Sequence, residues 1–78
     1  MSNEFIETVQ ESIFNLRKLV GYSVPLQVRI SPFDKVLLDN KYNLDESVYS
    51  SERNMILGLP LVIDDKMLPN EITVDTMP

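Results

Sequence analysis

The first twenty residues carry an apolar stripe that constrains the fold more than any other feature of this 78-residue chain. Its members recur at alternating spacings of three and four residues, which is the spacing of one helical face: Ile6, Val9, Ile13, Leu16 and Val20. Ser2 or Asn3 can accept the free N–H groups at the start of such a helix, and Gly21 can end it in a left-handed conformation. We therefore predict an amphipathic helix over residues 3–20.

The stripe has two possible partners. One face of a helix commonly packs on a sheet of the same chain. Apolar residues alternating at three and four positions also match just over two heptads of a coiled coil, which favours pairing between helices of two chains. Phe14 lies off the stripe, so it either packs on a second element or stays exposed.

The next segment alternates apolar and polar residues. Val24, Leu26, Val28 and Ile30 fall on one side of residues 24–30, which predicts a half-buried strand. Pro25 cannot donate a hydrogen bond, so it marks the start of the strand or the edge of a sheet. The residues Ser31 to Asp34 read as a turn, and residues 35–38 as a second short strand. This pattern predicts a hairpin, or two strands joined by a kink.

The second half of the chain completes a small sheet. Residues 43–54 are polar and predict a loop, with one helical turn starting at Asp45. Residues 55–63 are apolar enough for a strand buried on both faces, with Gly58 allowing a bend beside Pro60. Turns follow at 64–66 and 68–70, and residues 71–75 predict a last strand. We expect a single α+β domain over residues 1–78, with the helix packed on a mostly antiparallel sheet.

The composition argues against catalysis. The chain contains neither cysteine nor histidine, which removes disulfides, thiolate chemistry, imidazole bases and most zinc sites. Its two glycines form no phosphate-binding loop, and no acidic spacing matches a calcium loop. We predict that the protein is not an enzyme and that it has no catalytic, cofactor-binding or metal-binding residues.

The charge is unevenly distributed. Residues 31–78 contain nine of the twelve acidic residues and four of the seven basic ones, which accounts for the whole net charge of −5. An acidic surface repels phosphate backbones, so direct nucleic-acid binding is disfavoured, whereas a basic partner would be attracted. No apolar run reaches the roughly 18 residues that cross a bilayer, and the N-terminus does not resemble a basic secretory signal. We expect a cytoplasmic protein, or one in a particle assembled in the cytoplasm.

One segment resembles a known pattern. Residues 58–72, GLPLVIDDKMLPNEI, are similar to a hairpin found in structural proteins of tailed bacteriophages, including major capsid proteins, and in short phage open reading frames. The matching positions are Gly58, Pro60, Val62, Asp64, Asp65, Leu68, Pro69 and Ile72. The resemblance implies a phage-encoded protein located in the host cytoplasm or the virion. It is a hairpin signature and implies no functional residues.

Two functions follow from these features. The first is a protein–protein interaction module, a phage structural or assembly protein that buries apolar surface against copies of itself or another subunit, so that we expect a homo-oligomer or a complex. The alternative is a small acidic inhibitor of a basic site on a host enzyme or nucleic-acid-binding protein. The candidate partner-binding residues are the helix positions Ile6, Val9, Ile13, Phe14, Leu16 and Val20, together with Tyr49, Asp64 and Asp65.

Overall fold

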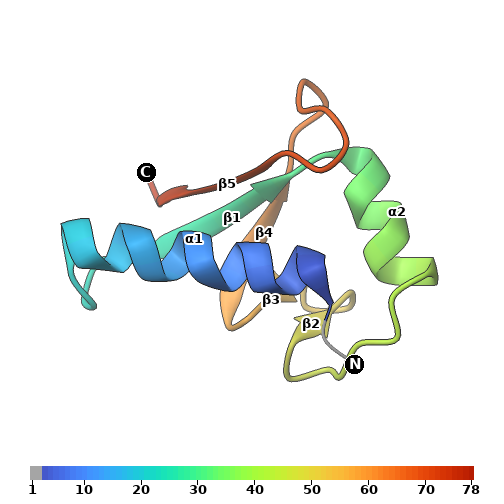
Figure 1. Ribbon diagram of the computed structural model, residues 1–78, viewed down its shortest axis with the longest axis horizontal. Helices are drawn as coiled ribbons and strands as arrows, with labels where there is room; N and C mark the ends of the chain where they lie inside the picture. The colour runs from blue at the N-terminus through green and yellow to red at the C-terminus, as the bar shows by residue number, and fades with distance from the viewer. Residues whose placement is uncertain (1–2) are drawn as a thin grey trace.

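The computed structural model describes residues 3–78 and begins with helix α1, Glu4–Val20, which lies across a five-stranded sheet (Figure 1). The Asn3 side chain caps the helix by accepting the N–H groups of Phe5, at 2.9 Å, and Ile6, at 3.3 Å. Gly21 ends the helix with a φ of 91°, a backbone angle that favours glycine. The predicted helix is confirmed, and Ser2 lies outside the described residues.

The sheet is mixed, with strand order β2-β3-β4-β1-β5. The central strand β1, Leu26–Ile30, begins directly after Pro25 and pairs in parallel with β4, Leu59–Ile63. On its other side it pairs antiparallel with β5, Ile72–Thr76. The short strands β2, Tyr49–Ser50, and β3, Met55–Ile56, add antiparallel pairs, so the expected mostly antiparallel α+β fold is confirmed.

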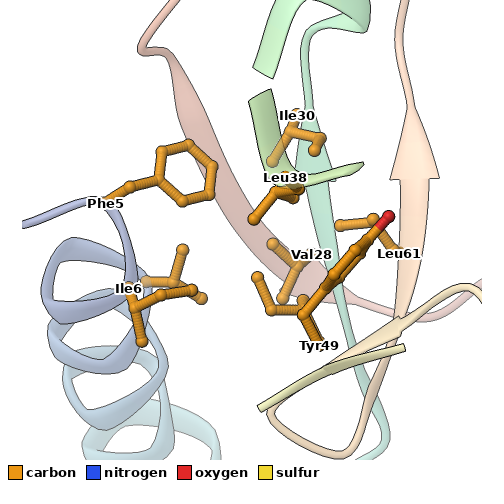
Figure 2. Close-up of a cluster of buried hydrophobic side chains, with 9 residues drawn as sticks. Phe5, Ile6, Val28, Ile30, Leu38, Tyr49 and Leu61 are labelled. Atoms are coloured by element: carbon orange, nitrogen blue, oxygen red, sulfur yellow. The ribbon is translucent and has the colours of Figure 1, made fainter. Parts of the chain in front are cut away.

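The core lies between α1 and the sheet. Figure 2 shows Phe5 and Ile6 of α1 pointing toward Val28 and Ile30 of the central strand. The other members of this cluster come from α1, from a second helix α2, Pro32–Asn40, and from β2, β3 and β4: Val9, Leu38, Tyr49, Ile56 and Leu61. The start of the apolar stripe therefore packs on a sheet of the same chain, the first of the two arrangements considered above.

The predicted strand at residues 35–38 is wrong, because this segment belongs to helix α2, Pro32–Asn40. Ser31 caps the helix by accepting the backbone N–H of Asp34 at 3.1 Å. Proline at the first helical position and an acidic residue at the third are also typical of a helix start. The segment read as a turn is therefore a helix cap, and the predicted hairpin does not form.

The predicted strand at 55–63 is interrupted. Leu57 and Gly58 both have positive φ angles, 51° and 79°, and form a two-residue turn between β3 and β4. Only Ile56 and Leu61 are buried in this segment, so the prediction of burial on both faces is wrong. The expected bend at Gly58 is confirmed.

The predicted loop at 43–54 does contain a helical turn, because the N–H groups of Val48 and Tyr49 donate to the carbonyl of Asp45 at 2.9 and 3.0 Å. It also contains β2, which the sequence did not predict. Within residues 3–78, no helix has both the length and the apolar character needed to cross a membrane.

Candidate functional site

A groove of about 290 Å³ lies between the second half of α1 and the turn that joins β3 to β4. We call it the Phe14 groove, and its lining residues are Gln10, Ile13, Phe14, Arg17, Tyr22 and Leu57. The volume lies just below the range of about 300–1,000 Å³ that is typical of ligand sites. The groove therefore suits one or two side chains of another protein.

The α1 wall of the groove is fixed by contacts of Lys18 and Arg17. Phe14 is 49% exposed, and the ammonium nitrogen of Lys18 lies 4.3 Å from the centre of its ring. The Arg17 guanidinium donates to the carbonyls of Gly21, at 3.2 Å, and Val24, at 2.5 Å. These bonds fix the chain after α1, where Tyr22 is 81% exposed. Two aromatic rings thus stand in solvent on one side of the molecule.

The opposite wall is formed by Leu57, whose backbone is in the left-handed region. That conformation costs a non-glycine residue about 1–2 kcal/mol, and two-residue turns of this kind normally carry Asn, Asp or Gly at the first position. The Leu57 N–H donates to the Val48 carbonyl at 2.7 Å, which keeps the turn against the preceding segment. Strained backbone conformations of this kind cluster at functional sites. The strained Leu57 therefore supports a functional role for the groove that it lines.

The predicted contact residues of α1 divide into two groups. Ile6 and Val9 are buried in the protein's own core, which leaves them no surface for a partner. Ile13 and Phe14 line the groove, whereas Leu16 and Val20 are partly buried and do not line it. The structure therefore brings two of the six predicted helix positions into the candidate site.

The three remaining predicted contact residues lie elsewhere. Tyr49 is buried, and its hydroxyl group bonds to α2 rather than to a partner. Asp64 pairs with Arg29 of the central strand at 3.2 Å, and Asp65 is exposed in the following turn. The backbone N–H of Lys66 and the Arg29 guanidinium hold the pKa of Asp64 below its usual value. None of the three lines the groove.

A polar cluster joins α2 to β2 and the turn after it. The Lys35 ammonium group donates to Asp39 at 2.8 Å, to the Tyr49 hydroxyl at 2.6 Å and to the Ser51 hydroxyl at 3.3 Å. Burial on its own would lower the pKa of Lys35, but the hydrogen bonds to Asp39 and Tyr49 outweigh it and raise the pKa. Lys35 is therefore a cation at neutral pH and is no base for activating Ser51. The cluster fastens the helix to the sheet.

This cluster makes the free energy of unfolding depend on pH in the acidic range. Hydrogen bonds from Lys35, and then from Tyr49, lower the pKa of Asp39 in the folded state. Its contribution is therefore complete above the unfolded-state pKa of about 3.9 and is lost as the pH falls through the lower folded-state pKa. We expect urea unfolding to show a smaller loss of stability between pH 5 and pH 2, roughly the window of this linkage, for Asp39→Asn than for the wild type.

The control for this pH series is Asp65→Asn, which changes an exposed aspartate with no ion pair among residues 3–78. It should keep the wild-type pH profile. An Asp39→Asn profile that falls as steeply as the wild type would show that the cluster does not contribute to acid sensitivity.

Sequence reasoning missed four lining residues of the groove: Gln10, Arg17, Tyr22 and Leu57. One feature of the sequence could have identified Tyr22 as a lining residue. It is an aromatic residue directly after the glycine that ends the helix, so it lies beside the last helical turn. Leu57 had none, since it sits within an apolar run that predicts an unbroken strand. Its approach to α1 depends on the tertiary fold.

In the part of the chain that the structure describes, no three Asp or Glu side chains gather in a way that would hold a metal ion. Comparison of the chain with protein-family models, curated proteins and solved structures finds no match. Residues 58–72 do not form the hairpin that the sequence predicted, because β4 and β5 pair with opposite sides of β1 and not with each other. The resemblance of this segment to phage proteins stays a prediction.

Proposed function

We propose that this protein is a non-enzymatic protein–protein interaction module whose Phe14 groove receives an apolar side chain of a partner protein. The setting that we propose, from the resemblance of residues 58–72, is a phage structural or assembly complex. The observation that carries the proposal is the half-exposed ring of Phe14, which stands beside the exposed Tyr22 at the mouth of an apolar groove.

The energetics support a contact role. Aromatic residues at the centre of a desolvated pocket contribute most of the binding energy in many interfaces, and alanine substitution there typically costs more than 2 kcal/mol, roughly thirtyfold in affinity. The α1 wall is already ordered by Arg17 and by the Lys18–Phe14 contact. A partner therefore meets a preformed surface and loses little conformational entropy from this side.

The chemistry of the polar side chains supports binding over catalysis. The Lys35 ammonium group lies 3.3 Å from the Ser51 hydroxyl, and its raised pKa keeps it protonated, so it is not a base for that hydroxyl. The acidic-inhibitor alternative gains less support from the fold. Asp39, Asp64 and Asp75 form ion pairs within the chain, and Asp34 is buried, so the charge that would face a basic partner is reduced.

The proposal is tested by quantitative capture of binding proteins from extracts of the cells that make it. Wild-type protein is compared with Phe14→Ala and with Leu57→Asn, which keeps a residue suited to the turn but removes the apolar wall. We expect both substitutions to weaken capture of the same partner by at least about tenfold, as at the centre of an interface.

Phe33→Ala is the matched control, because Phe33 is also on a helix and is 52% exposed but does not line the groove. It should capture the partner as the wild type does. Equal loss of capture for Phe33→Ala and Phe14→Ala, or no loss for either groove variant, would contradict a contact role for the groove.

A further inference from the structure

The loop between β4 and β5, residues 64–71, presents a leucine to solvent on a fixed backbone. Leu68 is 67% exposed. Its N–H donates to the Glu71 carboxylate, and the Glu71 N–H donates back to the Leu68 carbonyl at 3.1 Å. The backbone N–H of Asn70 is bound to the buried carboxylate of Asp34 in α2 at 2.8 Å. Leu68 is therefore a pre-organised apolar anchor.

The charges of this loop are opposite to those around the Phe14 groove. The loop contains three acidic residues and one basic residue, Lys66. Asp64 is paired with Arg29 of its own chain, which leaves Asp65 and Glu71 to face a partner. The second half of α1, residues 12–20, contains two basic residues and no acidic one, and the nearest acidic residue along the helix, Glu11, is exposed one turn before Phe14. Lys18 and Arg17 stand at the Phe14 wall itself. An acidic loop with a central leucine thus matches a basic rim around an apolar groove.

The two features belong to different sides of one molecule. Figure 1 shows the 64–71 loop at the top of the view on the side of α2, whereas the second half of α1 lies at the left. A subunit that offers the loop to one neighbour keeps its own groove open to another. Such a contact is heterologous, and it produces open chains or rings rather than a two-fold dimer.

We propose that the partner in the Phe14 groove is a second copy of this chain, which inserts Leu68 from its 64–71 loop in a head-to-tail contact. The groove volume of about 290 Å³ accommodates a leucine side chain. Asp65 and Glu71 of the incoming loop then lie near the cationic rim. This proposal rests on the contact role of the groove and adds the identity of its occupant.

Sedimentation velocity over a concentration series tests the proposal. The wild-type protein should grow beyond a dimer as concentration rises, and added salt should weaken the association because the charges on both sides become screened. Phe14→Ala, which loses the groove wall, and Leu68→Asp, which loses the anchor, should each weaken self-association by at least about tenfold. Val36→Asp, at an exposed apolar position of α2, should assemble as the wild type does.

Mixing the two defective variants gives the decisive result. A Phe14→Ala copy still offers Leu68, and a Leu68→Asp copy still offers an intact groove, so an equal mixture should form a heterodimer that stops at two chains. A wild-type protein that remains monomeric at every concentration would overturn the proposal. So would a wild type that forms only a two-fold dimer together with a mixture of the two variants that does not associate. Loss of capture of a different protein by Phe14→Ala would then leave the contact role of the groove standing.

Discussion

Asp34→Ala is expected to lower the free energy of unfolding by about 3 kcal/mol, because it removes a fully buried carboxylate that organises two elements. Asp34 accepts hydrogen bonds from the Ser31 hydroxyl at 3.0 Å and from the Asn70 backbone at 2.8 Å. After the substitution, the buried Ser31 hydroxyl loses its acceptor, which costs about 1–3 kcal/mol if it finds none. The partly buried N–H of Asn70 loses the bond that ties the loop to α2. The start of α2 and the 64–71 loop should loosen together.

Urea unfolding followed by circular dichroism measures this effect. Asp65→Ala is the control, since it removes an exposed carboxylate and should change the unfolding free energy by less than about 0.5 kcal/mol. Asp34→Asn keeps an acceptor of the same shape and should recover part of the loss. If Asp34→Ala were as stable as Asp65→Ala, the buried link between α2 and the loop would not exist in solution.

Sequence patterns correctly predicted the elements whose start and end depend on residues that are close in the chain. The helix over 4–20 could be read from its cap at Asn3, its stripe and Gly21, which all act within a few residues. The helix α2 could not, because Ser31-Pro32-Phe33-Asp34 fits both a turn and a helix start. The outcome depends on the burial of Asp34 and Leu38, which involves distant parts of the chain.

The candidate site shows the same division. Phe14 could be identified from the sequence because its position off the stripe is a local property of the helix. The wall at Leu57 could not, since a left-handed leucine contradicts the usual preference at that turn position. The sequence predicts Ile6 and Val9 as partner contacts, because the apolar stripe alone does not show whether the same chain or a partner covers it. Their burial against the sheet is a property of the whole fold.

Ile30→Ala is expected to destabilise the protein by about 3–4 kcal/mol, within the range of 2–5 kcal/mol found for large-to-small substitutions in well-packed cores. Ile30 is completely buried on the central strand and belongs to the main cluster (Figure 2). A chain of this size has little stability to lose, so we expect a substantial unfolded population without denaturant.

Ile63→Ala provides the matched control. Ile63 is the cross-strand partner of Ile30 in β4 but is 36% exposed, so the same chemical change should cost less than about 1 kcal/mol. Similar losses for the two substitutions would contradict the burial of Ile30 in the core.

We infer that the wall of the Phe14 groove serves contact with a partner and not the folding of the subunit. The most direct test is the unfolding free energy of Phe14→Ala, measured at a concentration where the protein is monomeric and compared with that of Ile30→Ala. We expect Phe14→Ala to lose about 1 kcal/mol or less, since half of the ring is in solvent. A loss equal to that of Ile30→Ala would place Phe14 in the core and contradict the claim.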